Sequence, residues 1–528
     1  MSSQLHDRID ALNTAQGRRI LTEIGRGIEK ESLRITPNGK VAQTAHPAAL
    51  GSALTHPSIT TDYSEALMEF ITPVSQSIDA SLRTLEEVHT YVYQHLGDDI
   101  LWSASMPCIM TGDDGIPVAQ YGSSNVANMK TVYRYGLGHR YGRLMQTIAG
   151  IHYNFSMPQE FWQGAWQEGG REGSLEDYTT TRYLGLIRNF QRYSWLLVYL
   201  YGASPAVCAS FLKGETGHNL VPFDEDARSL YLPYGTALRM GDLGYNSDAQ
   251  KDLNICYNSL DNYIQTLSKA ILQPHPDYAA IPSGEDGNYQ QLSDSLLQIE
   301  NEFYGPIRPK RVARSGETPL GALRREGIEY IEVRCIDINP FAAVGLDAQQ
   351  IRFVDTFLLF CLLEDSPPCT DAEQAIIDHN FKTIVNRGRE PGLMLKDHSG
   401  ERLFTELSDC LLGAMEPIAR LMDEAFENDD YLSALKEQKD KVADPELTPS
   451  ARMLREMRET ELPFFRLEME YSKSWAEHFR QATLSPEVQK QFDEETLRSI
   501  AARQDIEQSD SIDFEQYLAD FYAQYTVL

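Results

Sequence analysis

The sequence predicts an α+β protein, with a mostly antiparallel sheet built from distant chain segments and a helical C-terminal part. Strand-like alternation of apolar and polar residues recurs at 22–75, 151–157, 296–304 and 327–338. After about residue 345 the apolar residues take helical spacing. The regular strand–helix alternation of a doubly wound fold is missing, which favours antiparallel pairing.

The elements are expected in a definite order. A leading amphipathic helix covers 5–21, short strands follow to residue 75, and a helix with one apolar face covers 77–96. Further helices are expected at 130–145, 176–213 and 250–271, and in the C-terminal part at 346–363, 372–386, 403–426, 450–459 and 485–503. We expect a catalytic domain over 15–380, with a helical region, 381–528, packed on it.

Composition narrows the possible functions. The chain has 528 residues, 42% of them hydrophobic, which is ample for a large core. Its net charge of -30 opposes binding to nucleic acid or to an anionic membrane. Seven scattered cysteines without a CxxC pair indicate reduced thiols. With no signal-peptide pattern and no apolar run of bilayer length, a cytoplasmic protein is expected.

The strand at 327–338 carries the most informative pattern. Tyr330, Glu332 and Arg334 alternate with apolar residues, so they share one face of the sheet. A carboxylate and a guanidinium in the middle of a sheet are costly to desolvate unless something uses them. A metal for Glu332 and an anion for Arg334 would do so, and together they indicate nucleotide phosphate.

Other acidic residues and one histidine extend this interpretation. Glu29 and Glu31 lie two apart on a strand, about 6.5–7 Å along one face, where a Mg²⁺ ion would relieve their repulsion. The alternative is a solvated edge strand. Glu69 sits among apolar residues and needs either a metal or an arginine. His152 alone is typical of a satisfied core histidine, but beside carboxylates it becomes a credible metal ligand.

Basic and aromatic residues supply candidates for substrate contacts. Arg308, Lys310 and Arg311 form a cluster that we assign to the nucleotide phosphates, with neutralisation of nearby acid as the alternative. Arg239 suits bidentate capture of a carboxylate in a stretch rich in tyrosine, although core packing also explains such a stretch. There is no P-loop and no complete GxGxxG. A nucleotide would therefore be held by metals and basic side chains.

Several long runs together resemble one enzyme family. They are RGIEKESLRI, HPAALGSALTHPSITTDYSEALMEFITPV, YRYGLGHRYG, LMQTIAGIHYNFS, YLPYGTALRMGDLGYN, LQIENEFYGPIRPKR and GIEYIEVRCIDINPF. In these runs the chain resembles glutamate–cysteine ligase (γ-glutamylcysteine synthetase) of the proteobacterial type. The matches cover most of residues 20 to 345, whereas the region after about 380 matches only weakly.

The resemblance implies a carboxylate–amine ligase fold like that of glutamine synthetase, with a curved antiparallel sheet lining a funnel and helices outside. It implies ATP, L-glutamate and L-cysteine as substrates and Mg²⁺, or Mn²⁺, as cofactor. The family phosphorylates the glutamate γ-carboxylate, and the cysteine amine then attacks the γ-glutamyl phosphate. The products are γ-glutamylcysteine, ADP and phosphate, in the first step of glutathione synthesis. Glutathione is expected to inhibit at the glutamate site, and a monomer is expected.

The resemblance also implies roles for individual residues. Arg334 matches the arginine that steadies the transferring phosphoryl group, and Arg239 matches the residue that holds the cysteine carboxylate. The implied wall of the cysteine pocket is Tyr63, Tyr133, Tyr245 and Tyr304. The implied metal ligands are Glu29, Glu31, Asp62, Glu69, His152 and Glu332.

Three alternatives stay open from the sequence. A γ-glutamyl ligase with another amine acceptor would keep the phosphoryl site and change only the acceptor pocket. A catalytically silent nucleotide- or amino-acid-binding regulator would bind ATP without turnover. A scaffold using its acidic surface would tolerate changes at Glu29 and Glu332.

Overall fold

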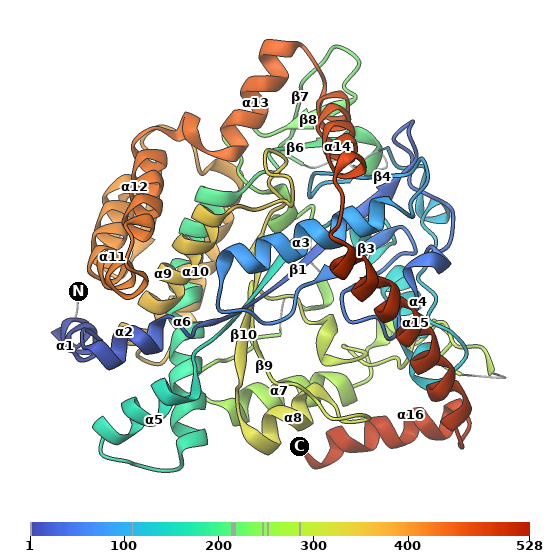
Figure 1. The fold of residues 1–528 in the computed structure, drawn as a ribbon, viewed down its shortest axis with the longest axis horizontal. Helices are drawn as coiled ribbons and strands as arrows, with labels where there is room; N and C mark the ends of the chain where they lie inside the picture. The colour runs from blue at the N-terminus through green and yellow to red at the C-terminus, as the bar shows by residue number, and fades with distance from the viewer. Residues whose placement is uncertain (1–2, 108, 213–217, 245–247, 251–252, 285–286) are drawn as a thin grey trace.

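An open antiparallel sheet runs through the centre of the molecule (Figure 1). The computed structural model describes residues 3–528, apart from 108, 213–217, 245–247, 251–252 and 285–286. The strands follow the order β2-β3-β1-β5-β10-β9, with β4 paired to β1. Their bounds are β1 Gly25–Ile35, β2 Ile59–Thr61, β3 Leu67–Ile71, β4 Ile100–Leu101, β5 Ile151–Ser156, β9 Ile307–Lys310 and β10 Tyr330–Ile336.

Strand register brings the acidic residues onto one face of this sheet. Glu31 lies opposite Glu69 across β1 and β3, and Glu29 lies opposite His152 across β1 and β5. Glu332 of β10 lies opposite the β5 residue two positions beyond His152. Since alternate side chains share a face, the carboxylates of three strands and the imidazole project together.

Helices cover the opposite face of the sheet. They include α3 (Ile78–Tyr93), α6 (Leu175–Tyr201) and α9 (Ala348–Leu363), and α3 lies across the sheet in Figure 1. The α9 residue Asp355 binds Arg26 of β1 at 2.7 Å and accepts a 2.6 Å hydrogen bond from the Tyr153 hydroxyl of β5. This buried triad fixes α9 against the two central strands.

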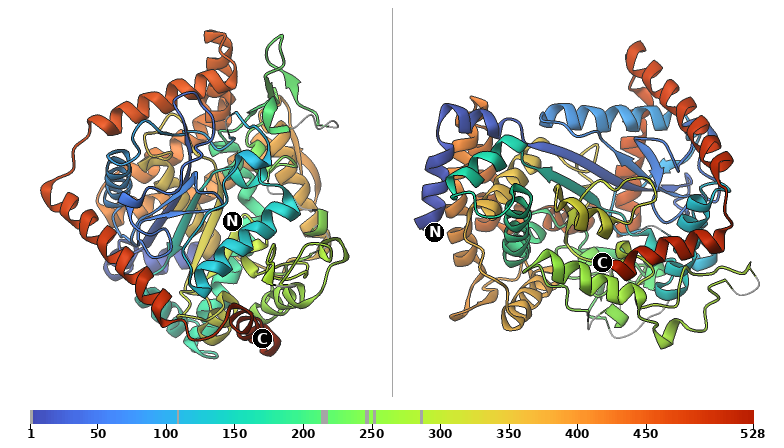
Figure 2. Two further views of the ribbon diagram at one scale, coloured as in Figure 1. Left: turned by 90° about the vertical axis from the view of Figure 1, so that its right-hand side faces the viewer. Right: turned by 90° about the horizontal axis from the view of Figure 1, so that it is seen from below.

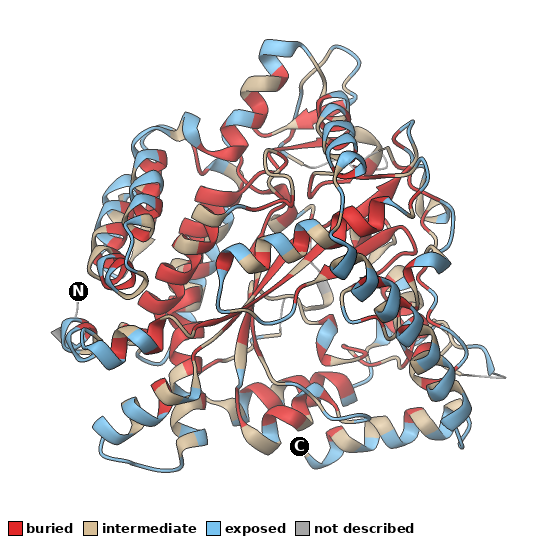
Figure 3. Cartoon of the chain, viewed as in Figure 1, coloured by how far each residue is buried: buried red, intermediate tan, exposed pale blue. Residues whose placement is uncertain are grey.

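The remaining elements surround this core. Figure 2 shows the C-terminal helices running along the outside of the molecule, and Figure 3 shows their outer faces exposed. Among the described residues, no helix combines the length and the apolar character needed to cross a bilayer. The other helices are α1 Ser3–Leu12, α2 Ala15–Leu21, α4 Asn125–Tyr141, α5 Gln159–Glu168, α7 Leu260–Leu272, α8 Pro319–Glu326, α10 Asp371–Arg387, α11 Phe404–Phe426, α12 Asp430–Ala443, α13 Pro449–Thr460, α14 Phe464–Gln481, α15 Pro486–Ser509 and α16 Phe514–Ala523. The other strands are β6 Ala206–Cys208, β7 Val221–Pro222, β8 Ser229–Tyr231, β11 Met394–Asp397 and β12 Gly400–Leu403.

The structure confirms the α+β class and most expected elements, and several boundaries differ. The leading helix is two helices, because the Thr14 side chain caps a new helix by accepting from the Gly17 amide. The helix expected at 176–213 ends at Tyr201, before a glycine. The helix expected at 250–271 begins only at Leu260, where Ser259 caps it.

The strand expected at 296–304 was wrong. Glu300–Glu302 is a short 3₁₀ helix instead. The Glu300 carboxylate accepts from the Leu320 amide, and the Glu302 carboxylate accepts from the Gln298 amide. Because these carboxylates accept from backbone amides, one on α8 and one in their own segment, they do not line a sheet face.

A buried glutamate on α14 predicts a pH-dependent stability. Burial raises the pKa of Glu468 to about 8, and its partner is the Ser103 hydroxyl at 3.2 Å. The folded state therefore holds a proton that the unfolded state releases above its ordinary pKa near 4.5, so stability should fall as pH rises from about 4.5 to about 8.

We expect Glu468→Gln to remove this fall in stability at higher pH, because the amide carries no charge to bury. Its melting temperature should exceed wild type by about 2–4 °C at pH 8 and match it near pH 4.5. Glu470→Gln, exposed on the same helix, is the control and should leave the difference between the two pH values unchanged. Equal melting of wild type and Glu468→Gln at pH 8 would contradict the assignment.

Candidate active site

Three side chains from three strands converge at the centre of the acidic face. Glu29, His152 and Glu332 each offer a ligand atom, and these atoms lie within 4.8 Å of one another. His152 Nδ1 lies 3.4 Å from a Glu29 oxygen and 3.8 Å from a Glu332 oxygen. Its Nε2 lies 3.7 Å from Glu31. The imidazole is thus surrounded by three carboxylates.

The electrostatics of these carboxylates reflect their crowding. Burial, and then the charges of Glu29, Asp62 and Glu31, raise the pKa of Glu69 well above its ordinary value. Burial likewise raises the pKa of Glu31. Glu332 is different: burial opposes its ionisation, but the charges of Lys310 and then Arg334 lower its pKa well below the usual range.

The donor set fits a hard divalent cation. Mg²⁺ takes carboxylate oxygens as ligands. Mn²⁺ takes carboxylate oxygens and also an imidazole nitrogen. The crowding that raises the pKa of Glu69 is the crowding that a cation would relieve. Asp62 lies in the turn between β2 and β3, close enough for its charge to act on Glu31 and Glu69. All six residues expected as metal ligands therefore lie in one region of the sheet.

Positive side chains flank the cluster on the β9–β10 side. Arg334 Nη1 lies 3.2 Å from Glu332, and Lys310 Nζ lies 3.3 Å from it. The β5–β10 register shifts between Val333 and Ile336, so Arg334 lies at an irregularity of the kind that re-aims side chains near active sites.

The side chains of the three residues assigned to the nucleotide point in different directions. Lys310 faces the carboxylate cluster. Arg308, on the same face of β9, is buried and donates to the carbonyls of Asn301 and Phe303. Arg311 follows the last strand residue and binds the Gly327 carbonyl and Glu326 at the outer edge. The charges of Lys310 and Arg308 both lower the pKa of Glu332, Lys310 with the larger effect, and all three nucleotide assignments stay predictions.

A cavity of about 620 Å³ adjoins the cluster, and Arg239, Tyr304 and Arg334 share its lining. Arg239 is buried, donates to the Arg334 carbonyl at 2.8 Å and lies 3.8 Å from Asp337. A Cβ at Gly150 would come within 2.0 Å of the guanidinium, so only glycine permits this approach. The cavity therefore joins a candidate anion site to a candidate carboxylate site.

Among the described residues of the predicted tyrosine wall, Tyr304 lines this cavity, and Tyr63 and Tyr133 lie near Tyr304. Tyr63 and Tyr133 both lie at α4: Tyr133 is on the helix, and the Tyr63 hydroxyl lies against Gly138, where a Cβ would be 2.4 Å away. Burial raises the pKa of both phenols, and the neighbouring Tyr304 adds to the effect. Tyr245 lies outside the described residues.

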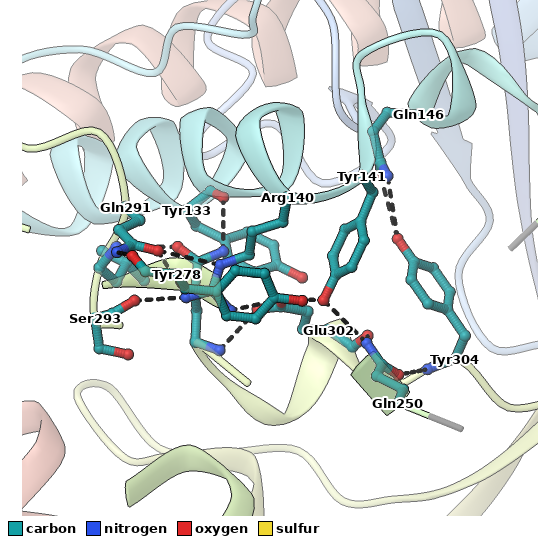
Figure 4. Close-up of polar contacts among 12 residues, drawn as sticks. Tyr133, Arg140, Tyr141, Gln146, Gln250, Tyr278, Gln291, Ser293, Glu302 and Tyr304 are labelled. Atoms are coloured by element: carbon teal, nitrogen blue, oxygen red, sulfur yellow. Dashed lines mark hydrogen bonds and ion pairs between the residues drawn. The ribbon is translucent and has the colours of Figure 1, made fainter. Parts of the chain in front are cut away.

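Sequence reasoning missed two residues that contact predicted site residues. Asn154 donates to Glu29 at 2.8 Å, and its alternation with His152 was the available signal. Gln146 exchanges a 3.3 Å hydrogen bond with the Tyr304 hydroxyl (Figure 4), and nothing in its sequence context marks it.

Comparisons with known proteins all indicate one enzyme family. A family model described as glutamate-cysteine ligase matches residues 9–384. Glutamate–cysteine ligase of Saccharophagus degradans is 49% identical over 508 residues, covering 96% of this chain and 96% of its own. That of Alcanivorax borkumensis is 49% identical over 523 residues, covering 98% and 99%.

Two solved structures are similar. Glutamate–cysteine ligase of Francisella tularensis, in complex with AMP, matches with a TM-score of 0.89 and 34% identity, covering 96% of this chain and 98% of that one. A bifunctional glutathione synthetase of Pasteurella multocida matches with a TM-score of 0.72 and 22% identity, covering 93% of this chain and 58% of that one. The second likeness shows the fold alone.

The crowded carboxylates predict opposite effects of one substitution with and without a cation. Glu69→Gln removes a carboxyl group whose ionisation its acidic neighbours oppose, so the variant should melt about 2–4 °C above wild type in a chelator. The same change removes a ligand, so the rise in melting temperature that Mg²⁺ gives wild type should be smaller or lost.

Differential scanning calorimetry without nucleotide measures both effects. The matched control is Glu86→Gln, an exposed glutamate on α3, which should change neither value. A Glu69→Gln variant that is less stable than wild type in chelator, and as strongly stabilised by Mg²⁺, would argue against the cation site.

Proposed function

This chain belongs to the glutamate–cysteine ligase family, and we propose that it performs that family's reaction. ATP phosphorylates the γ-carboxylate of L-glutamate, and the amine of L-cysteine displaces the phosphate. The products are γ-glutamylcysteine, ADP and phosphate. The observation that carries the proposal is the shared cavity, where Arg334 beside the carboxylate cluster meets Arg239 and Tyr304.

The chemistry requires such an arrangement. A carboxylate is a poor acyl donor, and phosphorylation converts its oxygen into a leaving group. Negative charge accumulates on the transferring phosphoryl group, so cationic groups must be fixed around it beforehand. We assign that role to Arg334, whose guanidinium is anchored on Glu332 at 3.2 Å. Lys310, 3.3 Å from the same carboxylate, adds a second positive charge.

The cysteine substrate must be oriented so that its amine faces the acyl phosphate. We place the cysteine carboxylate at Arg239, and the side chain between Tyr63, Tyr133 and Tyr304. Holding the amine near the acyl phosphate replaces a bimolecular encounter by a local one.

Mg²⁺ would be held by Glu29, Glu31, Asp62, Glu69, His152 and Glu332, and when bound it would neutralise phosphate charge.

Further expectations of the family are part of the proposal. The Francisella relative was solved with AMP, which supports an adenine nucleotide here. We expect residues 15–380 to carry the chemistry, 381–528 to support it, and glutathione to compete for the glutamate site. We further propose a monomer in the cytoplasm.

Phosphate release from ATP, followed by mass detection of the product, tests the function directly. With Mg²⁺ and glutamate, release should depend on cysteine and γ-glutamylcysteine should form. Glutamate-dependent release that cysteine leaves unchanged would keep the acyl phosphate and move the acceptor to another amine. Bound ATP without any release would contradict a ligase.

A substitution at the phosphoryl site gives the matching prediction. Arg334→Ala should lower the maximal rate of cysteine-dependent phosphate release by about 10²–10³, because a fixed charge at the transferring group is lost. Arg314→Ala removes an exposed arginine that pairs with Glu326, and should keep the wild-type rate. A folded Arg334→Ala variant with full activity would refute the assigned role.

A further inference from the structure

A buried ion pair lies behind the acceptor pocket, outside the groups used above. Arg140, in the last turn of α4, binds Glu302 at 2.9 Å, and both side chains are fully buried (Figure 4). Arg140 also donates to Gln291, and its guanidinium lies 4.1 Å from the centre of the Tyr278 ring. The Arg140 guanidinium therefore has both hydrogen-bond partners and an aromatic ring against it.

Glu302 receives further donors. The Tyr141 hydroxyl donates to it at 2.6 Å and the Gln298 amide at 2.7 Å. The Gln250 side-chain amide donates to the Tyr141 hydroxyl at 3.2 Å and to the Glu302 carbonyl at 3.0 Å. One carboxylate thus ties the end of α4 to the segment 298–304.

Both parts of this network carry residues of the predicted pocket wall. Tyr304 lies two residues after Glu302, and its amide donates to the Gln250 side chain at 3.5 Å. Tyr133 lies on α4, two turns before Arg140, and its carbonyl accepts from Gln298 at 3.2 Å. Displacing either part would change the distance between the two tyrosine rings.

A buried ion pair is a weak source of net stability, because desolvation offsets its attraction. Its better-attested use is to fix one arrangement among several. We propose that Glu302, with Arg140 and Tyr141, is a positioning group that sets the acceptor pocket and thereby the affinity and selectivity for cysteine. This proposal rests on the proposed function.

The chain offers a matched pair of variants. Glu302→Gln leaves a buried guanidinium without its counter-charge and risks misfolding, so Tyr141→Phe is the main variant: it removes one hydroxyl and keeps the ring. The control is Tyr153→Phe. It removes the same type of bond, a tyrosine hydroxyl to a carboxylate that also binds a buried arginine, on the opposite face of the sheet.

Steady-state kinetics should separate the two variants. For Tyr141→Phe we expect the KM for cysteine to rise about tenfold, with the KM for ATP within twofold of wild type. Selectivity for cysteine over 2-aminobutyrate, measured as the ratio of kcat/KM values, should change as well. Tyr153→Phe should lower only the melting temperature.

The outcomes distinguish the two levels of inference. Wild-type protein that forms no γ-glutamylcysteine would overturn the proposed function. Wild-type activity together with an unchanged cysteine KM and selectivity in Tyr141→Phe would overturn only the positioning role. An equal rise of cysteine KM in Tyr141→Phe and Tyr153→Phe would also overturn it, because the effect would then be general loosening.

Discussion

Repulsion among carboxylates held on one face of a sheet is the constraint on which the rest of this structure depends. Glu31 and Glu332 are buried and Glu29 lies within reach of both through His152. Such a face folds only if the strands are held firmly and if positive charge lies beside it. The helices on the opposite face supply the first condition, and Lys310 and Arg334 supply part of the second.

Buried arginine–carboxylate pairs recur where the architecture needs one fixed arrangement. Arg26 and Asp355 tie the central strand to the helix behind it at 2.7 Å. Arg140 and Glu302 tie α4 to the segment that carries Tyr304 at 2.9 Å. Each pair has a tyrosine hydroxyl as a third member. Tyr153 donates to the Asp355 oxygen that Arg26 does not bind, whereas Tyr141 and Arg140 donate to the same Glu302 oxygen. The first triad holds the sheet to α9, and the second holds α4 to the segment that carries Tyr304.

Local alternation predicted much of the sheet and of the site. Two-residue periodicity placed Glu332 on the same face as Arg334 and indicated that His152 faces away from its apolar neighbours. The strand register confirms that Glu332 and His152 converge. The order of the strands could not be predicted, because nothing local says that β1 lies between β3 and β5. Glu302 was misplaced for a related reason: its partners come from α4, far away in sequence, and override the strand-like pattern.

The topology also has a consequence for how the chain folds. The strand β1, near the start of the chain, is the middle of the sheet, yet its partner β5 and the strand β10 beyond it are made much later. Glu332 follows Glu31 by more than half the length of the chain. Contacts that join such distant segments form slowly, because the chain loses the entropy of closing a long loop before the contacts can stabilise it. During synthesis Glu29 and Glu31 therefore remain hydrated until the later strands bring Lys310 and Arg334 beside the carboxylate face.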